Sequence, residues 1–422
     1  MITLRPHQVK AIDMARPILA THGVVLLALQ QRLGKTFCAL SLADEIRSGG
    51  RVLFVTKKAA IPSILADSEA MGCFGNSLVV TNYESLHKLN GGFSVVIVDE
   101  CHRISSPKKP CKAARQIRGI CAGACKVILL SGTPAIESSV QWFNIFWATA
   151  LGPWKSYGGG VMAFYAWFKR YGISEKIRIA GGVEVESYKR CRAEVADDVA
   201  PYAVCMTQTD VGFKQQAEVV EHLIDDGLSL TLGNKIKNDG ILEFPCGGVA
   251  VAENPAAILQ KRAMICGGTV LSEEGKVLLT GSRAKIDFIL EHLRQGKQYA
   301  IFTQYIGERA FIAEALRDAG HSVGYDMDAF RDGEFSIFVG SIKRFAEGVD
   351  LSWLSGSMII YSLTFSGSTY AQILSRMCNW NRTEPIKVHV LMARGSVEEY
   401  IYKAVSSKQS FNESFYRKVG AC

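Results

Sequence analysis

The sequence VVLLALQQRLGKT, residues 24–36, joins an apolar run of strand length to a Gly-Lys-Thr turn, and a helix-forming stretch follows. A buried strand, a tight turn and a helix N-terminus form a cradle for phosphate, because backbone N–H groups and the helix dipole face the anion. Lys35 adds a positive charge beside Gly34, and Thr36 is a candidate Mg²⁺ ligand. A phosphate loop has glycine at the position of Leu29, so this motif alone leaves a chance match open.

An acidic pair follows a second apolar run. Residues 95–98, all Val or Ile, lead directly into Asp99-Glu100-Cys101-His102. Ligands of open α/β sheets bind at the carboxyl ends of the strands, so we expect Asp99 to hold Mg²⁺ through water there. Glu100 is expected to position or deprotonate an attacking water. Two carboxylates at the end of a buried strand require a metal, a partner or a cleft.

A third polar segment, residues 131–134 (SGTP), also follows an apolar run directly. Its hydroxyl groups are placed to hydrogen-bond the acidic segment. The segment would be an ordinary turn by itself, but the order and spacing of the three motifs favour one nucleotide site.

The chain alternates strand-like and helical segments in two regions, a pattern typical of parallel sheets covered by helices. The expected strands are residues 24–29, 52–55, 78–80, 95–98, 127–130, 299–302, 322–325, 337–339, 358–361 and 388–391. We therefore predict an α/β protein with a first lobe over 1–150 and a second over 281–422. A mixed, partly helical insertion over 151–280 is predicted between them. Its aromatic stretch, residues 164–171, either stacks bases or packs in a core, and its helical spacing favours the core.

Composition excludes several classes of protein. The 422 residues suffice for two or three domains, and 48% apolar with 21% charged residues argues against disorder. We see no secretory signal and no apolar run long enough for a membrane span, and we expect a soluble protein in a reducing compartment. Twelve cysteines are scattered along the chain, and Cys121 with Cys125 is expected to be structural rather than a zinc site.

The net charge of +8 is uneven, since residues 1–150 hold 17 Lys and Arg against 9 Asp and Glu. A basic run without acidic residues follows the acidic pair and includes Arg103, Lys108, Lys109, Lys112, Arg115 and Arg118. Such a run either contacts nucleic-acid phosphates or forms a solvated helix face. Lys343 and Arg344 are the corresponding candidates in the second lobe. Phosphate contacts carry no sequence information, so sequence-specific binding is not predicted.

The ordered motifs resemble those of superfamily-two helicases, whose first three core motifs match Lys35-Thr36, DECH at 99–102 and SGTP at 131–134. Three segments narrow the resemblance to the Swi/Snf-like DNA translocases: LRPHQ at 4–8, TNYE at 81–84 and DECHRISSP at 99–107. In the second lobe the resemblance continues through IFTQY at 301–305, SIKRFAEGVDL at 341–351, residues 372–382 and residues 385–399. Only the insertion is poorly matched.

The resemblance implies two RecA-like lobes that close on ATP, open after hydrolysis and step along one strand of DNA. It implies hydrolysis by Lys35, Thr36, Asp99 and Glu100, adenine recognition by Gln8, and stabilisation of the γ-phosphate by Arg376. Gly348 and Asp350 are implied near the nucleotide. Tyr83 is implied in a strand-contacting segment, and coupling of hydrolysis to movement is implied for His102, Ser131, Gly132, Thr133 and Gln372.

Two positions depart from the family pattern. Arg32 stands where the family commonly has glycine, and Asn379 stands where a second arginine is expected. An arginine finger contributes about 10³–10⁵ in rate, so its loss would disable hydrolysis. Arg382, one helical turn further on, is the candidate replacement.

The leading hypothesis is an ATP-dependent translocase or helicase on duplex or branched DNA, with Mg²⁺ as cofactor. The alternatives are an RNA helicase and an ATP-gated DNA clamp with weak turnover. We expect a monomer without membrane association, in the cytoplasm of a bacterium or a phage-infected host, working with replication or recombination proteins.

Overall fold

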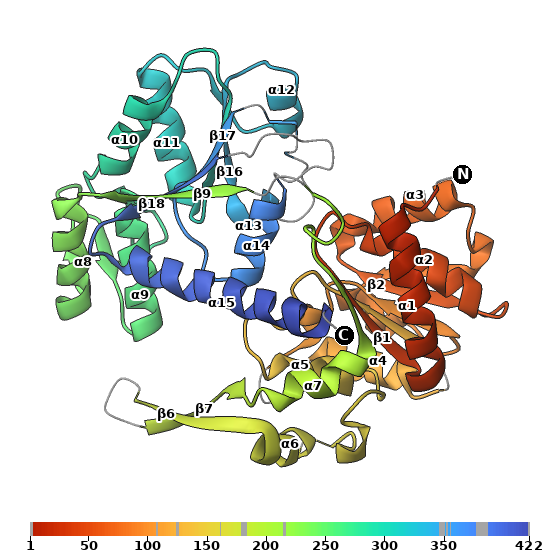
Figure 1. Ribbon diagram of the computed structural model, residues 1–422. Helices are drawn as coiled ribbons and strands as arrows, with labels where there is room; N and C mark the ends of the chain where they lie inside the picture. Colours follow the sequence, from red (N-terminus) through yellow and green to blue (C-terminus); the bar gives the residue numbers. More distant parts are fainter. Residues whose placement is uncertain are drawn as a thin grey trace. The chain divides into compact units, whose positions relative to one another are not determined.

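The computed structural model describes residues 3–106, 109–123, 126–160, 162–178, 184–213, 217–345, 351, 353–354, 356–376 and 387–420. The chain forms two compact units. Unit 1 comprises Met1–Phe213 and Lys408–Cys422, and unit 2 comprises Lys214–Ser407. Each unit is built on a six-stranded parallel sheet, so the predicted α/β fold with two parallel-sheet lobes is confirmed (Figure 1).

The sheet of unit 1 has the strand order β3-β2-β4-β5-β1-β8. Its strands are β1 (Val24–Leu29), β2 (Val52–Thr56), β3 (Leu78–Asn82), β4 (Val95–Val98), β5 (Lys126–Leu130) and β8 (Ala203–Met206). All six residues of β1 are buried. A strand with both faces covered tolerates only apolar side chains, which explains its uninterrupted apolar sequence.

Helices cover both faces of this sheet. On one face lie α1 (Pro6–His22), which contacts β1, and α2 (Lys35–Ile46), which contacts β4 and β5. The alternate residues Val24, Leu26 and Ala28 point to the other face, in one hydrophobic cluster with α4 (Lys112–Cys121), α5 (Gln141–Trp147) and α6 (Ala163–Tyr171). Helix α3 (Ile61–Met71) follows β2.

The aromatic stretch of α6 packs in the core. Phe164 and Trp167 are 1% and 0% exposed, and Trp167 stacks on Tyr171 with ring centroids 5.5 Å apart. The expectation of core packing rather than base stacking is therefore confirmed for these side chains. An antiparallel hairpin of β6 (Gly172–Arg178) and β7 (Glu184–Cys191) continues from α6, and α7 (Glu194–Val199) leads to β8.

The sheet of unit 2 has the order β15-β16-β14-β17-β18-β9. Its strands are β9 (Glu218–Ile224), β14 (Tyr299–Thr303), β15 (Val323–Gly324), β16 (Ile337–Ser341), β17 (Ser357–Ile360) and β18 (Lys387–Ala393). Helices α10 (Ala284–His292) and α11 (Ile306–Asp318) pack on one face. The other face is covered by α12 (Met327–Arg331), α13 (Ile342–Phe345), α14 (Gly367–Ser375) and the first part of α15 (Val397–Gly420).

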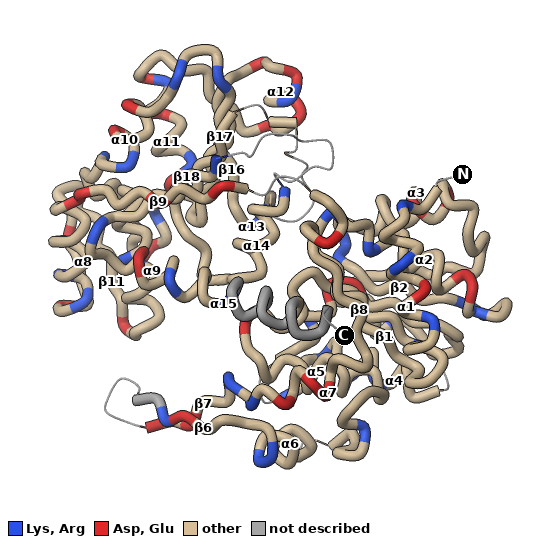
Figure 2. Tube along the Cα trace, viewed as in Figure 1, with Lys and Arg blue, Asp and Glu red and all other residues tan. Residues whose placement is uncertain are grey.

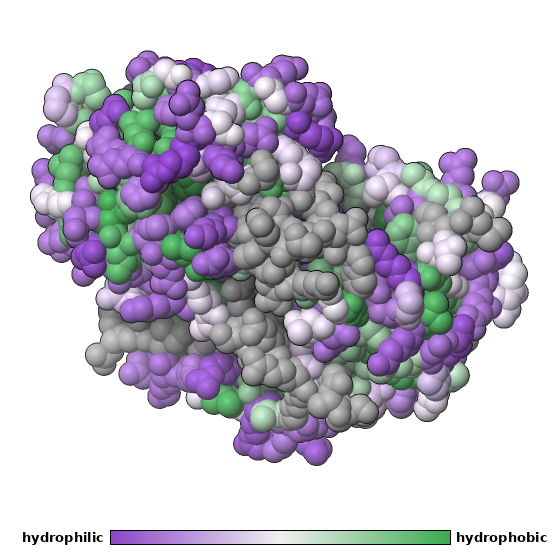
Figure 3. All heavy atoms as spheres, turned by 45° about the horizontal axis from the view of Figure 1, so that its top comes forward, coloured by the Kyte–Doolittle hydropathy of each residue, from purple (hydrophilic) through white to green (hydrophobic). Residues whose placement is uncertain are grey.

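A small satellite core lies between β9 and β14 in sequence. It is formed by α8 (Gly227–Asp239), α9 (Pro255–Cys266), β10 (Ile241–Glu243), β11 (Val249–Val251), β12 (Thr269–Leu271) and β13 (Val277–Leu279). Figure 3 shows green residues in small groups among purple ones on the described surface, the mixture usual for protein surfaces. No helix among the described residues has the length and apolar character of a transmembrane span.

The segment 151–280, expected as one insertion, is divided between the two units. Its residues up to 213 belong to unit 1, where β8 pairs in parallel with β1. Its residues from 214 belong to unit 2, where β9 pairs in parallel with β18. The segment thus supplies the sixth strand of each sheet, and both strands lie at a sheet edge.

A histidine pair lies at that edge of unit 2. The ring nitrogens His222 Nε2 and His389 Nδ1 are 2.8 Å apart. Burial, followed by the positive charges of His222, Lys387 and His292, lowers the pKa of His389 to about 4, against the opposing carboxylate of Glu218. The unfolded value is about 6.5, so between these values the unfolded chain binds a proton that the folded chain does not.

We therefore predict that the unfolding free energy of unit 2 falls as the pH is lowered from about 6.5 to about 4. His389→Asn is expected to flatten this dependence in urea unfolding measured across a pH series. His87→Asn, at an exposed histidine of unit 1, serves as the control and should leave the profile unchanged. An unaltered profile in His389→Asn would contradict the prediction.

Candidate functional site

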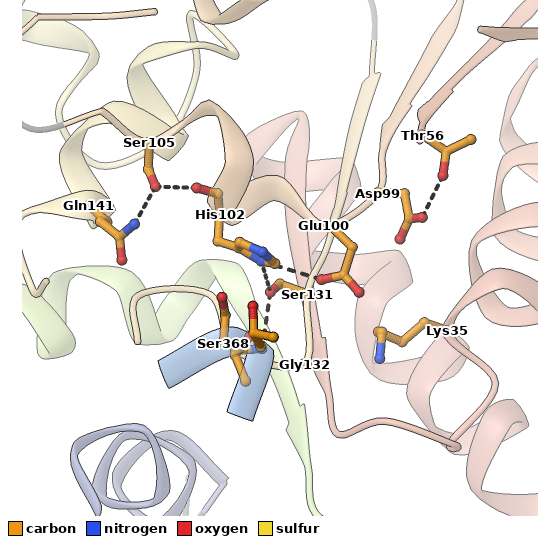
Figure 4. Close-up of polar contacts among 12 residues, drawn as sticks. Lys35, Thr56, Asp99, Glu100, His102, Ser105, Ser131, Gly132, Gln141 and Ser368 are labelled. Atoms are coloured by element: carbon orange, nitrogen blue, oxygen red, sulfur yellow. Dashed lines mark hydrogen bonds and ion pairs between the residues drawn. The ribbon is translucent and has the colours of Figure 1, made fainter. Parts of the chain in front are cut away.

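The polar motifs of unit 1 meet at one edge of its sheet. Because β1, β2, β4 and β5 are parallel, their carboxyl ends lie side by side. From these ends come the turn at 30–34, Thr56, the Asp99-Glu100 pair and the segment 131–134. Figure 4 shows Lys35, Asp99, Glu100, His102 and Ser131 converging there.

The turn after β1 has the geometry of a phosphate loop. Gly34 has φ +75° and caps α2, which begins at Lys35. The Lys35 ammonium donates to the carbonyl oxygens of Leu29 at 3.0 Å and Gln30 at 3.4 Å. Arg32, the position where the family has glycine, has φ +69°, a conformation that favours glycine. Arg32 therefore adopts the left-handed backbone conformation that a glycine would have in this turn, although it carries a side chain.

The N-terminus of α1 is attached to this turn. Gln8, predicted to recognise adenine, is buried, and its Nε2 donates to the Leu33 carbonyl at 3.4 Å. Its Oε1 accepts from the Arg5 N–H at 2.8 Å, and a His7 ring nitrogen lies 3.1 Å from the same Leu33 carbonyl. A Cβ on Gly34 would lie 2.0 Å from Gln8 Nε2. Only glycine fits between the loop backbone and Gln8.

Gln208 holds the loop from the other side, a contact that the sequence analysis missed. Its backbone N–H donates to Gln30 Oε1 at 2.7 Å, and its Nε2 donates to the Gln31 carbonyl at 3.0 Å. The Gln30 N–H donates to the carbonyl of Met206 at the end of β8. Since β8 was not predicted, no signal in the sequence pointed to Gln208.

The acidic pair is supported by uncharged partners. The Thr56 hydroxyl donates to Asp99 Oδ2 at 2.7 Å, and the Tyr83 hydroxyl donates to the Asp99 carbonyl. Burial, followed by the neighbouring Glu100 carboxylate, raises the pKa of Asp99 to about 6 despite Lys35 and Lys57. Glu100 has φ +49°, an uncommon conformation for a non-glycine residue. Such local strain clusters at functional sites.

His102 links the acidic pair to the segment 131–134. Its Nδ1 lies 3.3 Å from Glu100 Oε2 and 3.2 Å from the Ser131 hydroxyl (Figure 4). Burial lowers the pKa of His102, which keeps the ring neutral near pH 7. Ser131 Oγ also accepts from the Thr133 N–H at 3.0 Å. Polar contacts through His102 therefore connect the Glu100 carboxylate to the segment that follows β5.

The path continues to the end of the chain. The Tyr416 hydroxyl donates to the Gly132 carbonyl at 2.8 Å, and Tyr416 is 2% exposed in the core of unit 1. Lys408 pairs with Glu137 at 2.6 Å. Beside His102, the Gln141 side chain donates to the Ser105 hydroxyl at 2.7 Å. Neither Tyr416 nor Gln141 was among the predicted site residues.

The donor set suits Mg²⁺. The hydroxyl of Thr36 and the carboxylates of Asp99 and Glu100 are hard oxygen donors, the type that Mg²⁺ prefers. Burial, followed by repulsion from Glu100, raises the Asp99 pKa, and a divalent cation would relieve this repulsion. No group of three or more His, Cys, Asp or Glu forms a protein-only metal cluster among the described residues.

The predicted nucleic-acid residues of unit 1 differ in their surroundings. Arg103, Lys109, Lys112 and Arg115 are exposed, whereas Lys108 lies outside the described residues. Arg118 is half-buried, 4.7 Å from the Trp147 ring centroid, and donates to the Trp147 carbonyl. Tyr83, implied as a strand contact, is 7% exposed and supports Asp99 instead. Its aromatic ring is needed in the core, with the Arg103 guanidinium 5.5 Å from its centroid.

Several predicted residues belong to unit 2. Gln372 is buried on α14, Arg376 follows the end of that helix, and Lys343 and Arg344 are exposed on α13. Gly348, Asp350, Asn379 and Arg382 lie outside the described residues.

The fold comprises two RecA-like lobes, and the candidate site of unit 1 lies around the turn between β1 and α2. No protein-family model matches the chain. It is 21% identical over 395 residues to the human DNA repair and recombination protein RAD54B, covering 79% of this chain and 42% of that protein. It is also 21% identical, over an alignment of 460 residues, to the SWI/SNF-related matrix-associated actin-dependent regulator of chromatin subfamily A-like protein 1 of Xenopus tropicalis, covering 96% of this chain and 44% of that protein.

Two solved structures are similar to the chain. The helicase domain of Pyrococcus furiosus Hef has a TM-score of 0.50 at 16% identity, covering 96% of this chain and 100% of that one. The Sulfolobus solfataricus SWI2/SNF2 ATPase core in complex with dsDNA has a TM-score of 0.41 at 17% identity, covering 100% of this chain and 95% of that one. The chain spans less than half the length of the curated relatives it matches. The sequence matches confirm its resemblance to the Swi/Snf-like branch of superfamily two, and the Hef helicase domain supports the fold.

Gly34→Ala is predicted to weaken nucleotide binding by about tenfold, because the new Cβ would displace the end of the Gln8 side chain from the loop. Titration of a fluorescent ATP analogue measures the effect. Gly49→Ala is the matched control, since Gly49 has φ +77° but open space around its Cβ position. It should lose stability without losing nucleotide affinity; equal affinities in the two variants would contradict the role given to Gly34.

Tyr416→Phe is predicted to lower the unfolding free energy of unit 1 by about 1–2 kcal/mol, because it removes a buried hydrogen bond to Gly132. Urea unfolding monitored by tryptophan fluorescence measures this. Tyr402→Phe removes a hydroxyl from the same helix, but its partner Glu221 is exposed. That control should change the unfolding free energy by less than about 0.5 kcal/mol. A similar loss in both variants would contradict the stabilising role given to the Tyr416 hydrogen bond.

Proposed function

We propose that the chain is an ATP-dependent DNA translocase that hydrolyses ATP while moving on duplex or branched DNA. The observation that carries the proposal is the continuous polar path in unit 1. It runs from the acidic pair through His102 and Ser131 to Gly132, beside a phosphate loop with a lysine. A structural role alone leaves two half-buried carboxylates and this lysine unexplained.

In the proposed reaction, the loop backbone and Lys35 bind the β- and γ-phosphates of ATP. Glu100 positions the attacking water and accepts its proton, since the carboxylate lies at the same strand edge as Lys35 (Figure 4). Mg²⁺, held by Thr36 and through water by Asp99, would neutralise charge on the phosphates. Thr56 and Tyr83 hold Asp99 by hydrogen bonds, so the backbone of the acidic segment keeps its position while the Glu100 side chain is free to change partners.

Coupling to DNA is assigned to the groups beyond Glu100. When Glu100 changes partners on hydrolysis, the 3.3 Å contact to His102 changes with it, and the Ser131 hydroxyl loses or gains a hydrogen bond. The exposed basic residues Arg103, Lys109, Lys112 and Arg115 follow directly in sequence. They are proposed to bind DNA phosphates without sequence preference. The DNA-related names of the Swi/Snf-like relatives support this choice of polymer.

The test is ATP hydrolysis without nucleic acid and with double-stranded, single-stranded or branched DNA or RNA. Strong stimulation by duplex or branched DNA is expected. Glu100→Gln is expected to lower kcat by about 10²–10⁴ because it removes the general base, with ATP binding retained. Lys35→Ala is expected to lose ATP binding as well.

Lys58→Ala and Glu69→Gln make the same chemical changes at exposed positions of unit 1 outside the named motifs and should hydrolyse ATP at the wild-type rate. Preference for RNA would favour the RNA-helicase alternative. Binding of ATP and DNA with no turnover under any condition would favour the ATP-gated clamp.

A further inference from the structure

The end of α6 and the hairpin that follows it form a basic stretch within an otherwise acidic part of the chain. Residues 169–192 contain seven Lys and Arg but three Asp and Glu. Residues 193–280 contain six Lys and Arg but thirteen Asp and Glu. In Figure 1 the β6–β7 hairpin extends away from the sheet of unit 1, and Figure 2 marks charged residues along it and on α6.

The three glutamates of the hairpin are engaged within it. Glu175 pairs with Arg190 at 2.5 Å, and Glu184 pairs with Lys176 at 3.6 Å. Glu186 accepts hydrogen bonds from the hydroxyls of Ser174 and Tyr188. These contacts leave no hairpin glutamate to neutralise the remaining basic side chains.

Four basic residues stay without an ion pair among the described residues, and all four are exposed: Lys169, Arg170, Lys189 and Arg192. They gather where the hairpin begins and ends. Gly172 pairs with Cys191, and the Arg192 N–H donates to the Tyr171 carbonyl at 2.8 Å, which brings the end of α6 beside the end of β7. We call these four residues the hairpin-base cluster. Helix α7, which follows, carries acidic residues, but no ion pair joins them to the cluster within the described part of the chain.

The base of the hairpin is anchored to the segment that follows Thr133. The Ser138 hydroxyl donates to the Lys189 carbonyl at 2.6 Å, and the Cys191 N–H donates to the Ser139 hydroxyl at 2.8 Å. Gln141 fixes the same segment, because its side-chain oxygen accepts from the N–H groups of Glu137 and Ser138. Aromatic packing between Tyr188 and Phe168, with centroids 4.8 Å apart, holds the hairpin on α6. The cluster therefore sits on a fixed support that is hydrogen-bonded to the polar path of the site.

We propose that the hairpin-base cluster is a second DNA-contacting surface of unit 1, which binds backbone phosphates of the duplex. This inference rests on the proposed function and adds to it a contact outside the motif segments. Exposed cations without carboxylate partners suit a polyanion, and each phosphate they neutralise releases condensed counterions. The anchoring through Ser138 and Ser139 gives this contact a route to the segment 131–134.

The test measures duplex affinity by fluorescence anisotropy over a range of salt concentrations for full-length wild type and Lys189→Gln/Arg192→Gln. The slope of log affinity against log salt is expected to fall by about 2, close to 0.9 for each lost phosphate contact. Lys169→Gln/Arg170→Gln carries the same expectation and covers the case in which the first variant fails to fold. Lys235→Gln/Lys237→Gln, on exposed residues of α8 in unit 2, removes the same charge and should keep the wild-type slope.

A wild-type slope in both folded cluster variants would overturn the proposal. An equal loss in the α8 control would also overturn it, because net charge rather than the cluster would then explain the change. Failure of the wild type to bind DNA, or to be stimulated by it, would instead reject the proposed function itself. The two failures are therefore distinguishable in one set of measurements.

Discussion

Parallel pairing of β1, β4 and β5 is the constraint on which the site depends. The register of Val24 with Val127 and of Val98 with Leu129 aligns the carboxyl ends of three strands that are far apart in sequence. Because both faces of the sheet are covered, polar residues are excluded from the strands and appear where the strands end. Lys35, Asp99, Glu100 and Ser131 are thus brought together by the packing of apolar side chains that take no part in chemistry.

The charged groups at this edge have polar partners in the loop and on β2. Lys35 donates to loop carbonyls, while Asp99 receives a hydroxyl from Thr56. Burial, followed by the neighbouring Glu100 carboxylate, raises the pKa of Asp99 to about 6, so the pair carries an electrostatic repulsion that a cation can relieve. Neutral His102 transmits changes at Glu100 without adding a charge of its own. Because a bound ligand would relieve the repulsion within the acidic pair, the arrangement suits a site whose conformation changes when nucleotide binds.

Local patterns in the sequence were sufficient for the central strands and the loop. All ten expected strands are present, because long apolar runs between helical segments leave little choice of structure. The edge strands β8 and β9 were missed; β9 mixes charged with apolar positions, so its sequence lacks the apolar run that marks the central strands. Gln208 and Tyr416 were missed with them: their partners lie 177 and 284 residues away, and only tertiary folding creates those contacts. Tyr83 had a family-like motif around it, but burial in the core decides its orientation.

The fold also redistributes the charge asymmetry seen along the sequence. Unit 1 contains 28 Lys and Arg against 17 Asp and Glu, whereas unit 2 contains 20 against 23. Net charge counted over residues 1–150, 151–280 and 281–422 shows a smaller contrast. The reason is that residues 151–280 include both the basic hairpin of unit 1 and the acidic satellite core of unit 2. A polyanion is attracted by the electrostatic field of a folded surface. The charge is therefore summed over each folded unit rather than over consecutive stretches of sequence. The excess positive charge thus belongs to the same unit as the phosphate loop, the acidic pair and the hairpin-base cluster.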